Sequence, residues 1–123
     1  MAAVGSHTLP KEERLSGKTG ISALLGKGRW GSAGDIRYCW TDNGGELNRI
    51  MVSVPKRHFK RAVKRNLLKR RIREAYRTRK DLLTASGVDL MFVWSCPEVR
   101  PFDIISGDVA EILREISSKT RGK

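Results

Sequence analysis

Residues 60–80 read KRAVKRNLLKRRIREAYRTRK, a stretch that combines dense positive charge with a repeating apolar pattern. At the angular spacing of a helix, one side collects Leu68, Ile72, Ala75 and Tyr76. The nearly opposite side collects Asn66, Lys69, Arg70, Arg73 and Arg77. The pattern predicts a helix over about 61–79 that docks one side on a sheet and holds the other rigidly toward solvent.

The positive charge of the chain is concentrated around this helix. The chain has 123 residues and a formal net charge of +12, and the segment 56–80 contains thirteen Lys and Arg but a single acid, Glu74. That segment therefore carries as much net charge as the whole chain. Like charges at helical spacing repel one another, so such a helix is destabilised unless a polyanion neutralises it. The charge pattern favours nucleic-acid binding.

Other roles for a basic helix fit the sequence less well. A membrane-surface helix would carry a broad apolar face with aromatic edges, whereas the apolar stripe here is narrow. A leucine-zipper basic region would continue into a leucine heptad, and TASGVDLMFVW (84–94) does not. A helix-turn-helix needs a second helix close by, and both flanks here are expected to be strands.

The remainder of the chain predicts a small α+β domain. A short helix around Ile21, Leu24 and Leu25 should end near 26–28. Strands are expected at 35–42 and 49–54, joined as a hairpin by the NGG turn at 43–45. The apolar run VDLMFVW (88–94) predicts a central strand covered on both faces. A last helix should begin near Asp103 as its N-cap, with an apolar stripe of Ile105, Val109, Ile112, Leu113 and Ile116. The expected fold is a small mixed sheet packed by about three helices.

We expect a single RNA-binding domain over residues 9–118, with flexible tails at 1–8 and 119–123. No apolar run approaches the ~20 residues of a membrane span, and MAAVGSH at the start lacks the regions of a secretory signal. Cys39 and Cys96 share no CxxC spacing and are far in sequence from both histidines, His7 and His58. We therefore expect two buried, reduced thiols and no zinc site.

The segment VSVPKRHFKRAVKRNLLKRRIREAYR (52–77) resembles the signature of the bacterial ribonuclease P protein subunit. That signature is a strand ending in a V-S-x-K type motif, a short loop, and a helix reading roughly R-N-R-x-K-R-x-x-R-E-A-[FY]. The matching positions are Val52, Ser53, Val54, Lys56, Arg57, Arg65, Asn66, Lys69, Arg70, Arg73, Glu74, Ala75 and Tyr76. The segments 9–15, 21–28 and 88–94 are similar to further family segments, so the resemblance covers roughly residues 9–117.

Three positions depart from the family pattern. Leu67 stands where the R-N-R triplet has its second Arg, which removes one expected RNA contact. Ile21 and Leu25 stand at the two aromatic positions of the first helix, and they keep an apolar surface without a ring. The loop KRHFKR (56–61) is about one residue longer than the usual form.

The resemblance implies a ribonuclease P protein-like sandwich with a left-handed βαβ crossover, an exception to the usual right-handed rule. It implies a cytoplasmic accessory subunit of an endoribonuclease, whose catalytic RNA and bound Mg²⁺ cleave precursor tRNA at the 5′ end of the mature tRNA. The protein would bind that RNA and supply no catalytic group or metal ligand. The implied RNA-binding residues are Lys56, Arg57, Lys60, Arg61, Arg65, Asn66, Lys69, Arg70, Arg73 and Arg77.

The single-stranded 5′ leader is expected in a cleft lined by Ile21, Leu25, Tyr38 and Trp40. Bases stack well on aromatic rings, and Tyr38 and Trp40 share one face of the strand at 35–42. The alternative is that these two rings are core residues. Arg37, on the other face, could meet a phosphate.

Three other aromatic side chains and one imidazole are expected near the RNA or in the core. Trp30 is expected at the rim and Trp94 in the core. Phe59 could stack on RNA or anchor the start of the basic helix, and His58 could contact RNA. Two other classes of protein remain possible: a ribosomal or general structural RNA-binding protein, and a protein-only nuclease. The nuclease would need an acid cluster for metal, which the sequence does not contain.

Overall fold

The computed structural model describes residues 13–15, 18–84 and 86–121. The elements are α2 (Lys18–Lys27), β1 (Arg29–Ala33), β2 (Ile36–Asp42), β3 (Arg49–Ser53), α3 (Ala62–Arg79), the 3₁₀ turn η2 (Lys80–Leu82), β4 (Val88–Trp94) and α4 (Phe102–Arg121). The predicted helices and strands are present close to their predicted bounds, and the α+β class is confirmed. Two or three strands were expected before the basic helix, but none was predicted at the position of β1.

The four strands form one mixed sheet in the order β1-β2-β4-β3. β1 pairs antiparallel with β2, β2 pairs antiparallel with β4, and β3 pairs parallel with β4. The predicted hairpin between β2 and β3 is therefore wrong, because β4 lies between them. The NGG segment instead ends β2, where the Asn43 N–H donates to the Gly87 carbonyl at 2.7 Å. The β3–α3–β4 unit is the expected crossover, and its left-handed sense remains a prediction.

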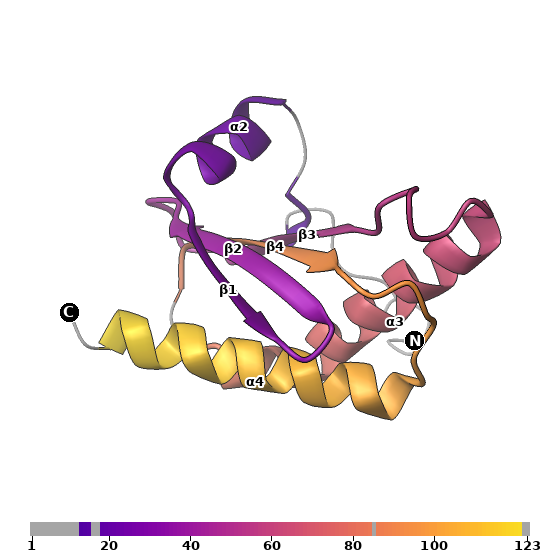
Figure 1. The fold of residues 1–123 in the computed structure, drawn as a ribbon. Coiled ribbons are helices and arrows are strands. Elements are labelled where there is room, and N and C mark those ends of the chain that lie inside the picture. Colours follow the sequence, from indigo (N-terminus) through magenta and orange to yellow (C-terminus); the bar gives the residue numbers. More distant parts are fainter. Residues whose placement is uncertain (1–12, 16–17, 85, 122–123) are drawn as a thin grey trace, which may run out of the picture.

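The sheet separates two layers of unequal size (Figure 1). α3 and α4 cover one face and enclose the main core, in which the predicted α4 stripe from Ile105 to Ile116 is fully buried. α2 lies on the other face over a smaller cluster that includes Leu24, Cys39 and Met91. β4 is central, and Trp94 is 0% exposed, as expected. Both cysteines are free and buried, as predicted.

The two ends of α4 differ from expectation. The Ile105 N–H donates to the Pro101 carbonyl at 3.2 Å, so Pro101 occupies the N-cap position and Asp103 lies in the first turn. A carboxylate there is still favoured by the positive end of the helix dipole. At the other end α4 continues to Arg121, so the predicted tail from residue 119 is partly helical. The predicted tail at 1–8 lies outside the described residues.

The β1–β2 hairpin is packed against α4 through a close backbone approach. Gly34 has φ +57°, and a Cβ at this position would lie 2.4 Å from the Asp108 carboxylate. The Asp35 N–H donates to Asp108 Oδ2 at 3.4 Å. Desolvation by burial, with Asp35 nearby, raises the pKa of the Asp108 carboxyl above its usual value. The hairpin therefore rests on a carboxyl group that is less stable when ionised than in water.

The substitution Asp108→Asn should raise the melting temperature more at neutral pH than in acid. A raised folded-state pKa contributes stability that is present below the unfolded value of about 3.9 and is lost as pH rises through the folded value. Because asparagine does not titrate, the difference in melting temperature between variant and wild type should grow from pH 3 to pH 7. Glu111→Gln removes the same charge from an exposed position of the same helix as a control. A difference that is constant with pH would contradict the assignment.

Candidate nucleic-acid interface

The outer side of α3 carries the basic residues that the sequence places there. Leu68, Ile72, Ala75 and Tyr76 are at most 1% exposed and pack into the main core. On the opposite side Asn66, Arg70 and Arg73 are exposed, and Lys69 and Arg77 are half-buried. We call these last five residues the basic face of α3. The docked apolar side fixes its direction, so the predicted division of the helix is confirmed.

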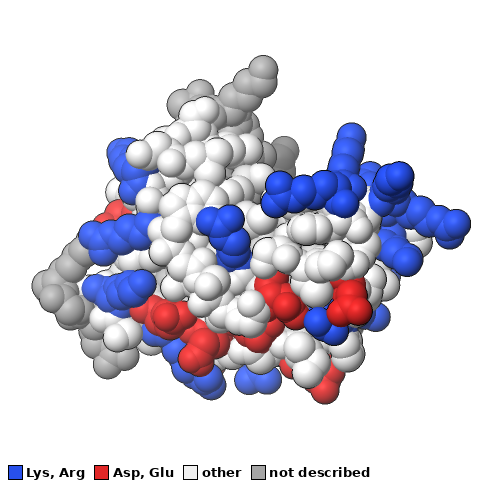
Figure 2. All heavy atoms as spheres, viewed as in Figure 1, with Lys and Arg blue, Asp and Glu red and all other residues white. Residues whose placement is uncertain are grey.

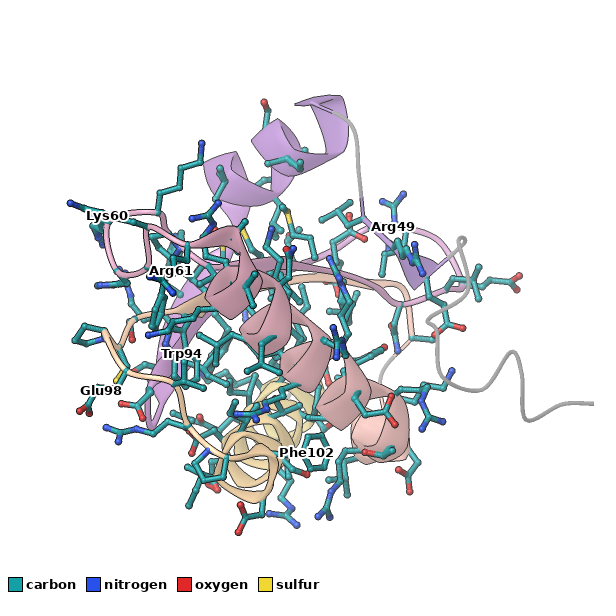
Figure 3. All side chains as sticks on the ribbon, turned by 90° about the vertical axis from the view of Figure 1, so that its right-hand side faces the viewer. Arg49, Lys60, Arg61, Trp94, Glu98 and Phe102 are labelled. Carbon is teal, nitrogen blue, oxygen red and sulfur yellow. The ribbon has the colours of Figure 1, made fainter. Side chains whose placement is uncertain are left out.

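The loop before α3 adds further cations at one end of the molecule. Lys56, Arg57, Lys60 and Arg61 are all exposed. Figure 3 shows Lys60 and Arg61 at the start of α3, on the opposite side of the view from Arg49. The first turn of α3 contains no acidic residue, so the positive end of the helix dipole adds to these charges. In Figure 2, Lys and Arg gather over this end, and Asp and Glu lie lower, along α4.

Arg65 ties the loop to the helix. Its Nη1 donates to the carbonyl oxygens of Phe59 at 2.7 Å and Lys60 at 2.9 Å. Phe59 is 6% exposed within the main core, so it anchors the start of α3 and presents no free ring to RNA. The Nε2 atom of His58 is also enclosed by protein. Arg65 thus shapes the loop in addition to any contact with RNA.

A cation that the sequence did not single out lies beside the basic face. Arg14 is held at the edge of β3 by a bridge to Ile50, where the Leu15 N–H donates to the Ile50 carbonyl at 2.7 Å. Desolvation and the positive charge of Arg14 together lower the pKa of the Arg73 guanidinium. Arginine remains charged at neutral pH, so two cations are held close together. No local pattern in the polar segment around Arg14 could have predicted this, because the pairing is between residues far apart in sequence.

One predicted contact of the basic face is already engaged within the protein. Arg77 forms an ion pair with Glu74 one turn earlier on α3, and its Nε lies 3.1 Å from Glu74 Oε1. The hydrogen bond to Glu74 raises the pKa of Arg77. Glu74 is the single acid of the basic segment, and it neutralises Arg77 at the C-terminal end of the basic face. The other basic positions carry the excess charge.

The prediction that Tyr38 and Trp40 line an open cleft is wrong. Each is 1% exposed and lies in the main core on the face covered by α3 and α4. The Tyr38 hydroxyl donates to Glu115 of α4 at 3.4 Å, and Arg29 lies 5.3 Å from the centre of the Trp40 ring. Burial is the first cause, and the Glu115 carboxylate the second, of a raised pKa for Tyr38. The alternative that both rings are core residues is correct.

The accessible face of the sheet is the opposite one, under α2. We call it the α2 face; the strand residues that point to it include Trp30, Arg37, Cys39, Met51, Met91 and Val93. Trp30 is 45% exposed, as expected of a rim residue, and the Arg37 guanidinium lies 5.0 Å from the centre of its ring. Ile21 is half-buried and Leu25 is 46% exposed on α2, so the structure places these two predicted cleft residues beside this face.

α2 is held close to the sheet at its C-terminal end. A Cβ at Gly28 would lie 2.2 Å from the Cys39 sulfur, and the Cys39 thiol donates to the Leu24 carbonyl at 3.7 Å. Burial raises the pKa of the Cys39 thiol, which keeps it protonated and unreactive. Gly28 therefore allows the α2–β1 connection to pack directly on the Cys39 side chain and to cover this part of the α2 face.

Further along the same face a pocket of about 400 Å³ opens between α2 and the strands. Lys27 of α2 lies on one side, and Thr41, Arg49 and Asp89 of the sheet lie on the other. Asp89 is 5% exposed and accepts bonds of 2.8 Å from both Nε and Nη2 of Arg49, and one of 2.8 Å from Asn43. The α2 face thus runs from an aromatic rim at Trp30 to a polar, well-ordered end at Arg49.

The described residues, 13–15, 18–84 and 86–121, also bear on metal and membrane binding. Among them, no three or more His, Cys, Asp or Glu side chains come together in a group that could hold a metal ion. No helix within the same residues is long and apolar enough to span a bilayer.

The comparisons with known proteins agree with one another. The family model described as Ribonuclease P matches residues 9–117. A ribonuclease P protein component from Dictyoglomus turgidum is 38% identical over 116 residues, which cover 94% of this chain and 95% of that protein. One from Porphyromonas gingivalis is 36% identical over 86 residues, covering 68% of this chain and 63% of the relative.

The solved structures that resemble this chain have the same fold. The ribonuclease P protein of Thermotoga maritima superposes with a TM-score of 0.75 at 22% identity, covering 85% of this chain and 97% of that one. The protein from Staphylococcus aureus gives 0.73 at 21% identity, covering 84% and 94%. At 21–22% identity these structures show that the fold is shared. The family model that matches residues 9–117 shows the family. The chain belongs to the ribonuclease P protein family.

Proposed function

We propose that this chain is the protein component of ribonuclease P. It binds the catalytic RNA of that enzyme and the 5′ leader of precursor tRNA, and it assists endonucleolytic removal of the leader. The observation that carries the proposal is the basic face of α3, a rigid row of cations on a helix that is fixed by its buried side. The family match over residues 9–117 supports the identity of the RNA.

The catalytic RNA is the partner of the basic face and the loop before it. Arginine suits this role because its planar guanidinium binds phosphate oxygens through two donors. The positive charge of Arg14 adds to that of Arg73, which raises the positive potential on this side of α3 and attracts a phosphate there. Arg65 supports the same contact by fixing the loop that presents Lys60 and Arg61.

The leader of precursor tRNA occupies the α2 face. Its bases meet the apolar surface of Ile21 and Leu25 and of the strand residues below, and Arg37 meets its backbone. This site is distinct from the basic face, because α2 and α3 pack against opposite faces of the sheet. The chain can therefore hold the catalytic RNA and its substrate at once.

Chemistry belongs to the RNA subunit. The Mg²⁺ of the holoenzyme is bound by that RNA, and the chain's own residues bind and orient the two RNAs without taking part in bond cleavage. The site of action is the cytoplasm, where precursor tRNA is processed.

A cleavage assay at low Mg²⁺ tests the proposal. Precursor tRNA is incubated with the cognate ribonuclease P RNA, with this chain, and with both. The chain alone should be inert and should lower the Mg²⁺ concentration at which the RNA cleaves, since its cations replace part of the counterion atmosphere. If the chain does not change cleavage by its cognate RNA, the proposal is wrong, and binding to ribosomal RNA would be the next measurement.

A further inference from the structure

Ile21 and Leu25 of α2 carry no aromatic ring, so a ring that stacks on a leader base must come from elsewhere on the α2 face. Of the eight aromatic residues, all of which are described, six are at most 6% exposed. The other two are Trp30, at 45%, and Phe102, at 38%. Phe102 begins α4, in the layer on the far side of the sheet, and Figure 3 shows it beside that helix. Trp30 is therefore the single accessible ring on the α2 face.

The surroundings of Trp30 suit a nucleotide. Trp30 lies on the edge strand β1, which runs along the near side of the sheet in Figure 1, and it pairs with Cys39 of β2. Arg37 is the diagonal neighbour of this pair, and its guanidinium lies 5.0 Å from the indole centre. The guanidinium lies over the ring, so a base stacks on the indole surface that stays exposed while the cation meets the adjoining phosphate, a combination by which proteins bind single-stranded nucleic acid.

We propose that Trp30 and Arg37 form the nucleotide-stacking site for the 5′ leader, with Trp30 under a base and Arg37 on the neighbouring phosphate. The inference rests on the proposed leader-binding function and assigns it to Trp30 of β1 and Arg37 of β2, in place of rings on α2. Ser32, which pairs with Arg37 on the same face, places an exposed hydroxyl beside the ring, and Arg37 adds N–H donors. Stacking on Trp30 itself is open to any base, because every base has a π-face.

The dependence of affinity on leader length distinguishes binding at Trp30 from binding at the rest of the interface. In the wild-type holoenzyme, the affinity for precursor tRNA is measured as the leader is extended one nucleotide at a time. One extension should add about tenfold in affinity, because stacking of a base on an aromatic ring has a magnitude of that order. Trp30→Leu keeps an apolar side chain without a ring and should remove this step. Trp30→Phe should keep part of it.

Phe102→Leu is the matched control, since it makes the same kind of change at the other exposed ring. It should leave the whole length dependence unchanged. Arg37→Ala should make the slope of log affinity against log salt concentration for leader binding shallower by about 0.7, the value for one phosphate contact on a single strand. Trp30→Leu should leave that slope unchanged. The emission of Trp30, the single exposed indole, should be quenched by precursor tRNA and not by mature tRNA.

The outcomes separate the two claims. If the wild type gains affinity with leader length and Trp30→Leu gains equally, the leader-binding function stands and the assignment to Trp30 is overturned. If the wild type shows no dependence on the leader at all, the leader-binding function itself fails, and the assignment fails with it. Loss of the step in Trp30→Leu, with its retention in Phe102→Leu, supports both.

Discussion

The double variant Arg70→Ala, Arg73→Ala is expected to bind the catalytic RNA on the order of 100-fold more weakly than the wild type at physiological salt. Each arginine is exposed on the basic face, where it can form charge-assisted hydrogen bonds to phosphate. Two such bonds, each at the lower end of the usual range of about 1.5–3 kcal/mol, account for a loss of this size. The loss should fall on binding alone, because neither side chain is part of the buried side of α3.

Salt dependence identifies the cause of that loss. The slope of log affinity against log salt should become shallower by about 1.5–2, close to one unit for each phosphate contact removed. Arg114→Ala, Lys119→Ala is the matched control, since both residues are exposed on α4 and the change in net charge is the same. Equal losses in the two double variants would mean that net charge, and not the direction of the basic face, determines affinity.

The elements that the sequence predicted well are those with strong local patterns. The bounds of α3 are within one residue of the prediction because a narrow apolar stripe in a basic helix has one way to pack. β4 matches from Val88 to Trp94 because a continuous apolar run is typical of a central strand. In both cases the residues that decide the structure are neighbours along the chain.

The errors concern choices that local pattern does not determine. The NGG turn correctly predicted a reversal after β2, but nothing near it shows that β4 is inserted beside both β2 and β3. β1 was missed because RWGSA is short and contains glycine, serine and alanine, which are uncommon in strands. Because β1 was not predicted, the sequence could not assign Trp30 to either face of the sheet.

The open face of β2 was also predicted wrongly because local pattern does not determine it. Both faces carry apolar or aromatic side chains, with Tyr38 and Trp40 on one and Cys39 on the other. Which face is open depends on which one α4 covers, and α4 begins 60 residues after β2 ends (102 − 42). A shift by one residue along a strand exchanges every side chain between the faces. The two predicted cleft residues of β2 therefore point to the covered side of the sheet.

Trp40→Ala is expected to cost stability and to leave leader recognition intact. Deleting a fully buried tryptophan side chain typically costs about 3–5 kcal/mol of unfolding free energy. For a chain of this size the melting temperature should fall by roughly 10–20 °C. Since the ring is 1% exposed on the face covered by α3 and α4, no leader nucleotide can reach it in the folded protein.

Trp40→Phe provides a folded variant in which recognition can be measured. It keeps an aromatic ring in the core, and it removes an indole Nε1–H that is buried with no hydrogen-bond partner among the described residues. An unsatisfied buried donor costs about 1–3 kcal/mol, so its removal offsets part of the lost packing. The holoenzyme with Trp40→Phe should discriminate precursor from mature tRNA as the wild type does, measured below its melting temperature. A selective loss of affinity for precursor tRNA would return Trp40 to the leader site and require the core face of the sheet to open when RNA binds.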